Sequence, residues 1–345
     1  MDKIKIYTDF EKISDIPHFG YVFPLIEYLY KKNETLLAYY EIVQDISEAD
    51  YVALPIAVEY LFASQDKAYF NHFLQKAHEH NKKVLVFTSG DVGKTIHDEN
   101  VITIRLGGFK SKFPCQTFIM PPFIEDPLLK MDLSFSLLKH QEQPTIGFVG
   151  HSASGIKKWI KEFLIFVKGL VKRIIKKDYT DFQSFYPSSL KRHQLLMELK
   201  NKTQIKTDFI FREKYRAGLN SDQDRKKTTA EFFKNIEQNP YTFCMRGGGN
   251  FSVRFYETLA MGRIPLLVDT DCKLPFENII NWDKHIVKIE ESNFGAVENE
   301  ILKFHNRFEE KEFEAVLKEN RKLWEEYFTK EGYFISLYHE LKILL

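Results

Sequence analysis

Residues 241–291 read YTFCMRGGGNFSVRFYETLAMGRIPLLVDTDCKLPFENIINWDKHIVKIEE, and this stretch decides the fold. An apolar run at 241–245 is followed by a triple glycine, an amphipathic segment at 251–261 and a second apolar run at 264–268. The order predicts a strand, a glycine loop, a helix with Asn250 as its N-cap, and a second buried strand. Such a unit is typical of a parallel sheet with crossover helices.

The loop between the predicted strand and helix has the composition of a phosphate site. The backbone N–H groups of Gly247, Gly248 and Gly249 would meet a helix N-terminus there, an arrangement that binds anions. Arg254 falls in the first turn of the helix, where a cation opposes the helix dipole and needs a compensating anion. Arg246 approaches the same place from the end of the strand. Together these groups predict a pocket for a diphosphate.

The helix after the loop indicates what the pocket holds. Asn250, Arg254 and Glu257 fall on one helical face, with Glu257 one turn beyond the phosphate end and Ser252 at the start. A carboxylate at that place can accept two hydrogen bonds from the diol of a ribose, which favours a nucleoside diphosphate over inorganic phosphate. The alternative is a tight turn before a surface helix whose Arg254 and Glu257 form an ion pair with each other.

The same residues carry a resemblance to a known family. The segment resembles the exostosin family of glycosyltransferases in its FCMRGGGN loop, its SVRFYETLAMGRIPLLVDTD run, and its LPFENIINW and VKIEE stretches. Weaker similarities lie upstream, in SEADYVALP at 47–55 and VLVFTSGD at 84–91. The resemblance implies a GT-B fold, an inverting transfer, a nucleotide-sugar donor such as a UDP-sugar, and no required metal or other cofactor.

Length and composition exclude several classes of protein. The 345 residues suggest two domains of ordinary size, and the formal net charge of +1 argues against a nucleic-acid-binding protein. The three cysteines lie far apart without metal-ligand spacing, so we expect neither a disulfide framework nor a metal site. The N-terminus lacks the long apolar run of a signal peptide, and we expect a cytoplasmic protein.

The apolar runs divide the chain into two α/β halves. Strands are expected at 3–7, 50–54, 83–88, 101–105, 117–120, 145–149 and 207–211, besides those of the opening segment. A long helical stretch is expected after the strand at 50–54, up to Glu79. We expect two Rossmann-like parallel-sheet domains that face a central cleft. Their predicted bounds are 1–128 for the acceptor domain, 129–143 for a linker, 144–326 for the donor domain, and 327–345 for a helix that returns to the acceptor domain.

Further candidate donor residues follow two other strands of the second half. Gly150, His151 and Ser152 begin a small-residue loop, and the carboxyl ends of parallel strands face the ligand crevice. The alternative for this loop is a plain turn. Arg212 ends the next strand and is a further candidate for the donor phosphates, with Lys214 and Arg216 as weaker ones. Asp269 and Asp271 follow the strand at 264–268, and we interpret them as turn formers that could also contact the sugar.

A basic amphipathic helix is expected at 157–177. Its lysines fall opposite Ile160, Leu164, Val167 and Val171, a pattern typical both of a helix on an anionic membrane and of a domain helix with one solvated face. The first reading adds a peripheral contact with the inner membrane face and suits a lipid-linked oligosaccharide acceptor.

The catalytic base is expected on the N-terminal domain, across the cleft from the donor. Asp91, after the strand at 83–88, and His18, after the first strand, are the candidates. The predicted function is an inverting glycosyltransferase that moves a sugar from a UDP-sugar to a glycan acceptor, in surface polysaccharide or glycoconjugate synthesis. The alternatives are a nucleotide-sugar epimerase of GT-B-like fold and a non-catalytic protein that binds nucleotides or glycans.

Overall fold

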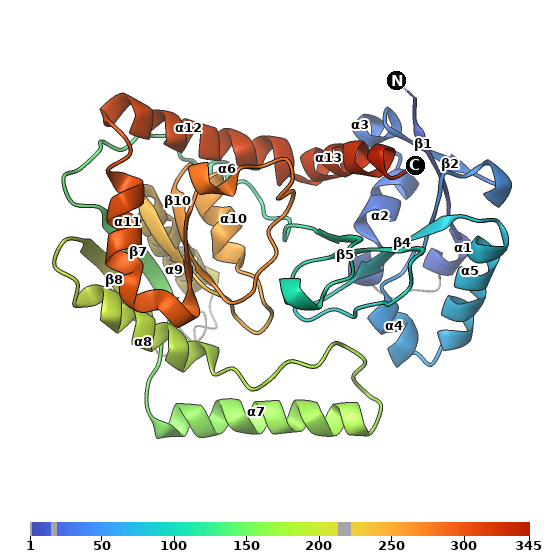
Figure 1. Cartoon of the computed structure of the whole chain (residues 1–345), viewed down its shortest axis with the longest axis horizontal. Helices are drawn as coiled ribbons and strands as arrows, with labels where there is room; N and C mark the ends of the chain where they lie inside the picture. The colour runs from blue at the N-terminus through green and yellow to red at the C-terminus, as the bar shows by residue number, and fades with distance from the viewer. Residues whose placement is uncertain (1, 15–18, 213–221) are drawn as a thin grey trace.

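The computed structural model describes residues 2–14, 19–212 and 222–345, which form two α/β domains side by side (Figure 1). His18, Lys214 and Arg216 lie outside the described residues, so their predicted roles stay predictions.

The N-terminal domain is built on a parallel sheet with the strand order β2-β1-β3-β4-β5-β6. Its strands are β1 (Ile4–Tyr7), β2 (Tyr40–Val43), β3 (Tyr51–Ala53), β4 (Lys83–Thr88), β5 (Val101–Arg105) and β6 (Thr117–Ile119). Strands β4 and β5 coincide with the expected apolar runs and form the buried centre, because both faces of the sheet are covered. The shorter helices of this half are α1 (Glu11–Ser14), α2 (Pro24–Tyr30) and α3 (Glu34–Leu37).

Two features of this half differ from the sequence prediction. Strand β2 was not expected, because its YEIV segment is short and only half buried. The single helical stretch expected before residue 79 is two helices, α4 (Val58–Ala63) and α5 (Lys67–Glu79). Between them Gln65 has a φ of 63°, a left-handed conformation that a continuous helix does not contain.

The C-terminal domain holds a second parallel sheet with the strand order β11-β10-β9-β7-β8. Its strands are β7 (Thr145–His151), β8 (Lys206–Arg212), β9 (Tyr241–Cys244), β10 (Ile264–Asp269) and β11 (Val287–Glu290). Its helices include α8 (Ser188–Lys200), α9 (Asp222–Gln238), α10 (Val253–Ala260) and α11 (Val297–His305). The opening segment of the sequence therefore forms the centre of this domain, as β9, α10 and β10.

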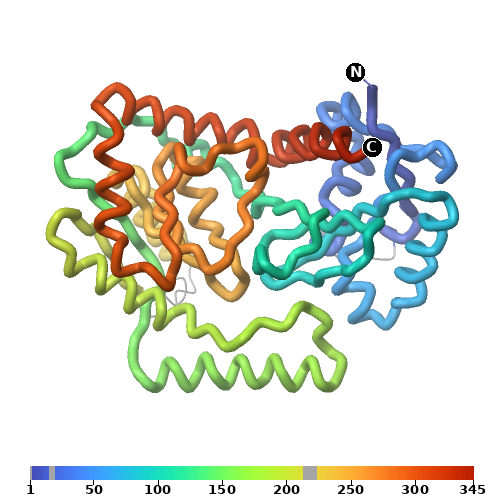
Figure 2. Tube along the Cα trace, in the orientation of Figure 1, coloured from blue at the N-terminus to red at the C-terminus, as the bar shows by residue number. Residues whose placement is uncertain are grey.

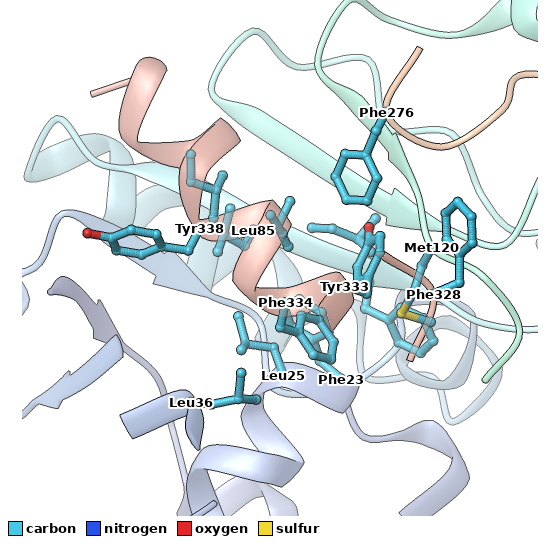
Figure 3. Close-up of a cluster of buried hydrophobic side chains, with 14 of the residues drawn as sticks. Phe23, Leu25, Leu36, Leu85, Met120, Phe276, Phe328, Tyr333, Phe334 and Tyr338 are labelled. Carbon is cyan, nitrogen blue, oxygen red and sulfur yellow. The ribbon is translucent and has the colours of Figure 1, made fainter. Parts of the chain in front are cut away.

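Two C-terminal helices join the domains along one edge. Helix α12 (Glu310–Tyr327) packs on α10, and α13 (Lys330–Ile343) continues onto the N-terminal domain. The Tyr40 hydroxyl donates to the carbonyl of Phe334 at 2.7 Å, and the Tyr51 hydroxyl donates to that of Leu341 at 2.6 Å. Phe334, Phe23 and Leu85 belong to one continuous core, to which Phe276 of the C-terminal domain also contributes (Figure 3).

A long excursion connects the domains on the opposite edge. After β7 the chain forms α7 (Ile156–Ile174), which runs beneath both domains, and it returns through residues 175–187 to α8 (Figure 2). Along this return, Asp181 accepts hydrogen bonds from the amide and hydroxyl of Thr95 at 2.9 and 2.6 Å and pairs with Arg105 at 3.2 Å. The excursion is thus attached to the N-terminal domain as well. In the described ranges, no helix is long and apolar enough to cross a membrane.

Candidate active site

Three arginines converge at the carboxyl ends of β7 and β9. Arg192 on α8 donates to the carbonyls of His151 and Arg246 at 3.0 and 2.9 Å, and Arg254 on α10 donates to that of Val149 at 2.8 Å. Within the described residues, Arg192, Arg246 and Arg254 form no ion pair with a carboxylate, and each keeps a buried Nε–H without an acceptor.

Burial of these unpaired cations has an electrostatic cost. It lowers the pKa of Arg192 to about 10 and also lowers the pKa values of Arg246 and Arg254. Unpaired charge is costly in a protein interior unless a counter-charge is supplied. The cluster is therefore prepared to receive an anion.

Arg246 is held where the two domains meet. Its side chain is 3% exposed, and its guanidinium lies between the rings of Phe109, at 5.2 Å, and Tyr186, at 4.6 Å. It also donates to Gln183 Oε1 at 2.5 Å. Because Phe109 belongs to the N-terminal domain, the position of Arg246 depends on how the domains are packed. Stacking on two rings fixes the guanidinium plane while leaving Nε–H free.

Arg254 lies inside the C-terminal domain, in the first turn of α10 as the sequence predicts. Its guanidinium stacks on Phe148 at 4.4 Å, and a methyl group built on Gly150 would lie 2.7 Å from its Nη2. A side chain at position 150 would therefore displace this guanidinium. The Arg254–Glu257 ion pair of the alternative interpretation is not formed, and within the described ranges the Glu257 carboxylate accepts no hydrogen bond. Burial raises the pKa of Glu257, although Arg254 lowers it in part.

The glycine loop supplies further donors. In the part of the chain that the structure describes, none of the N–H groups of residues 247–251 donates a hydrogen bond. A methyl group built on Gly247 would meet no atom within 4 Å, so this glycine faces open space. The loop thus presents free amides beside the arginine cluster, as an anion site requires.

Asp91 of the N-terminal domain lies against this loop. A methyl group built on Gly248 would lie 3.3 Å from Asp91 Oδ2, and one on Gly249 would lie 1.9 Å from the Asp91 carbonyl oxygen. The structure therefore brings this predicted base candidate against the predicted donor loop. The Asp91 side chain is exposed and free to meet an acceptor.

Asn250 does not cap the helix, which corrects the prediction. Helix α10 begins at Val253 with Ser252 at the N-cap, and the Ser252 side chain makes no capping hydrogen bond. The Asn250 amide instead donates to the carbonyls of Thr270, at 2.9 Å, and Gly108, at 3.1 Å. Its side chain therefore connects the two domains, and its bonds are used for domain packing.

The two acidic residues after β10 also serve the turn and the domain contact. Asp269 accepts from the amide of Cys272 at 2.7 Å and pairs with Lys288 at 3.1 Å. Asp271, with a φ of 67°, accepts from the Ser111 hydroxyl at 2.5 Å across the domain boundary. Their interpretation as turn formers agrees with these contacts.

The remaining predicted donor residues already have partners. The Ser152 hydroxyl bonds His193 at 3.1 Å, and His151 Nδ1 lies 3.1 Å from the carbonyl of Arg212. Burial lowers the pKa of His151, which favours the neutral form of its imidazole. Arg212 pairs with Glu231 at 2.5 Å, so it lacks the unpaired charge that distinguishes the arginine cluster.

A cavity of about 420 Å³ opens beside Arg246 and Gly248. It lies between the glycine loop, the inner face of α7 and the 178–188 return, with Val92 of the N-terminal domain at its edge. Glu162 of α7 also lines this cavity, and its Oε2 is buried without a partner. The anion site therefore has an adjoining space that both domains and α7 line.

Sequence reasoning missed three of the groups described here. Arg192 lies in a helix without a glycine loop, and Glu162 lies in a helix dominated by lysines, so neither had a local signal. Glu59, in the first turn of α4, accepts from the amide of Ser89 at 3.1 Å, and burial raises the pKa of its carboxyl to about 7. Glu59 could have been suspected, because it follows a buried strand of the same sheet as Asp91.

Two parallel-sheet α/β domains that face each other are the architecture of the GT-B class of glycosyltransferases. The model of one family, the Exostosin GT47 domain, matches residues 129–303, just over half of the chain, and the chain belongs to this glycosyltransferase family. No curated protein matches the sequence.

Several solved structures are similar at low identity. A glycosyltransferase from Rickettsia africae ESF-5 is 12% identical, with a TM-score of 0.39 and 99% of each chain covered. TarM is 13% identical, with a TM-score of 0.37, over 84% of this chain and 54% of that one. An alpha1,3-fucosyltransferase is 13% identical, with a TM-score of 0.34, over 92% of this chain and 82% of that one.

Proposed function

We propose that this glycosyltransferase moves a sugar, with inversion at the anomeric carbon, from a UDP-sugar to a glycan acceptor. The observation that carries the proposal is the cluster of Arg192, Arg246 and Arg254 beside the free amides of the glycine loop. Three guanidinium groups, of buried Arg246 and half-buried Arg192 and Arg254, have no carboxylate partner among the described residues, and they favour a ligand with more than one negative charge. A nucleoside diphosphate supplies that charge. Glu257, which has no partner in the part of the chain that the structure describes, lies one turn farther along α10 and suits the hydroxyls of its ribose.

The same groups suit the chemistry of the transfer. A base removes the proton of an acceptor hydroxyl, whose oxygen then bonds to the anomeric carbon as the bond from that carbon to the diphosphate oxygen breaks. Negative charge develops on the departing diphosphate, where arginines and backbone amides stabilise it. A well-placed donor of this kind contributes roughly 3 kcal/mol to lowering the barrier.

Asp91 is the proposed base. Its exposed carboxylate belongs to the N-terminal domain and lies against Gly248 of the donor loop. Glu59 restrains the same loop through Ser89, two residues before Asp91. A base on one domain and a leaving-group site on the other suit an in-line displacement between them.

The test is a panel of UDP-sugars with oligosaccharide acceptors, in which UDP release is followed and the new linkage is read by NMR. The proposal expects acceptor-dependent UDP release and a linkage of opposite anomeric configuration to the donor. Asp91→Asn should lower turnover on the order of 100-fold or more without weakening UDP binding. A new UDP-sugar formed without acceptor would instead identify an epimerase, and a retained configuration would contradict inversion.

The acceptor is proposed to be a surface polysaccharide or a lipid-linked oligosaccharide at the cytoplasmic side of the membrane. No cofactor is included in the proposed reaction, because the arginines and amides supply the positive charge at the leaving group.

A further inference from the structure

Helix α7 presents an apolar stripe to the outside of the molecule. None of its residues is buried, and it lies beneath both domains at the periphery (Figure 2). The stripe consists of Ile156, Ile160, Leu164, Val171 and Ile174, whose exposed fractions are 69, 46, 60, 49 and 78%. These residues recur at helical spacing, so they form one continuous line along about 28 Å of helix.

The inner face of α7 lines the cavity beside Arg246 and Gly248. Phe166 packs against Phe185 with ring centroids 5.5 Å apart, and Lys158, Glu162 and Arg173 line the space beside the glycine loop. The outward stripe makes no such contact. A domain helix with a solvated face should expose its polar side, whereas α7 exposes aliphatic side chains. This surface therefore needs a partner that the described chain does not supply.

The charges beside the stripe indicate what the partner is. One flank of the outward face carries exposed basic residues, which are Lys157, Lys161, Lys168 and Lys172, with Lys176 and Lys177 after the helix. The acidic residue of α7, Glu162, points inward and is 16% exposed. A second copy of this chain would bring two lysine rows together in a symmetric contact, which like-charge repulsion opposes.

We infer that α7 lies in the headgroup region of an anionic lipid bilayer, with its stripe among the upper acyl chains and its lysines among the phosphates. An amphipathic helix with aliphatic and aromatic residues on one face and lysines beside them binds membranes in this way. The docking does not depend on the proposed reaction. If the proposed function also holds, docking places the cavity within about one helix diameter of the lipid surface, where a lipid-linked acceptor would be presented.

The test is co-sedimentation of the full chain with phosphatidylcholine vesicles, with and without about a third of phosphatidylglycerol. The proposal expects binding to the anionic vesicles, much weaker binding to the neutral ones, and loss of binding at high salt. Replacing Lys157, Lys161, Lys168 and Lys172 with Gln should weaken binding by several hundred-fold, at about five-fold per lysine. The matched control replaces Lys311 and Lys318, exposed on α12, and should bind as the wild type does.

A second variant examines the stripe. Ile160→Glu with Leu164→Glu should abolish vesicle binding, whereas Leu129→Glu with Ile343→Glu, which are exposed at 81 and 78% elsewhere, should not. UDP affinity is measured on each variant as well. An unchanged value shows that the variant is folded with an intact donor site, so that a loss of vesicle binding comes from docking. Wild-type protein that stays in the supernatant with anionic vesicles would overturn the inference. Normal vesicle binding by the stripe variant would also overturn it. So would a protein that does not bind vesicles but forms a dimer that the stripe substitutions dissociate.

Discussion

Gly249→Ala should disable transfer by separating two loops that must touch. A methyl group at this position would lie 1.9 Å from the carbonyl oxygen of Asp91 and 2.7 Å from its carbonyl carbon. Cβ atoms do not approach other heavy atoms closer than 3.0 Å, so the glycine loop and the Asp91 loop must part by about 1 Å or more. Both contacts are with backbone, which cannot rotate away as a side chain does.

The expected loss follows from that displacement. A misplacement of about 1 Å between reacting groups costs on the order of 100-fold in rate. We therefore expect kcat to fall about 100-fold in Gly249→Ala, with UDP affinity changed only a few-fold, because Arg192 and Arg254 lie within the C-terminal domain. The assay is steady-state UDP release with donor and acceptor, together with calorimetric titration of UDP.

Gly247→Ala is the matched control. It places the same methyl group two residues away, where no atom lies within 4 Å, and should retain kcat within a few-fold. Wild-type turnover in Gly249→Ala would refute the account of the cleft. An equal loss in both variants would also refute it, because the effect would then not come from contact with Asp91.

Two further predictions concern stability. The pKa of Glu59 is raised by burial to about 7 from 4.5, so its contribution to folding is complete below pH 4.5 and is lost as pH rises through 7. In denaturant titrations, the free energy of unfolding should fall by roughly 3 kcal/mol between pH 5 and pH 8, and this fall should be absent in Glu59→Gln. The same pH dependence in the variant as in the wild type would contradict this role of Glu59. Asp126 is half-buried, which would raise its pKa, but its two hydrogen bonds with Arg321, at 2.9 and 2.6 Å, help to lower it. The contribution of Asp126 to folding stability is therefore present above pH 3.8 and lost below it. Asp126→Asn should destabilise the protein at pH 7 by about 2 kcal/mol. The control, Glu326→Gln at an exposed ion pair, should change stability by less than about 0.5 kcal/mol. Equal effects of these two substitutions would show that the Asp126–Arg321 pair does not anchor α12.

Much of the architecture was predictable because its signals are local. Strands β4, β5, β9 and β10 are apolar runs bounded by turn residues, and these signals do not depend on distant contacts. Strand β2 was missed because its four residues alternate weakly and gain their burial from α13, almost three hundred residues later. Local pattern carries little information about such a partner.

The site residues also fall into those that a local sequence signal predicts and those that it does not. Arg246, Arg254 and the three glycines stand together in one segment, so their convergence could be predicted from spacing. Arg192 could not, because its guanidinium reaches the cluster from a different helix. Asn250 shows the opposite failure: Asn before a helix is a usual N-cap, but here tertiary contacts with Gly108 and Thr270 use its side chain instead.

The sequence alone does not predict which face of α7 points away from the domains. Periodicity separates the aliphatic stripe from the lysines, but it does not tell which side packs on the domain. In the structure the inner side is formed by residues such as Phe166 and Glu162, which lie between the two groups on the helical wheel. Only the position of α7 beneath the cleft resolves this choice.

The central claim is that the arginine cluster binds the diphosphate of a nucleotide donor. Calorimetric titration of UDP, UMP and uridine tests it most directly, with the wild type, Arg246→Gln, Arg254→Gln and the exposed control Arg307→Gln. A charge-assisted hydrogen bond contributes about 1.5–3 kcal/mol, so each cluster substitution should weaken UDP binding by about 10- to 100-fold while the control leaves it unchanged. We expect the wild type to bind UDP more tightly than UMP and UMP more tightly than uridine. The differences in affinity among the three ligands should be smaller in both cluster variants. UDP binding that is equally tight in the wild type and both cluster variants would contradict it.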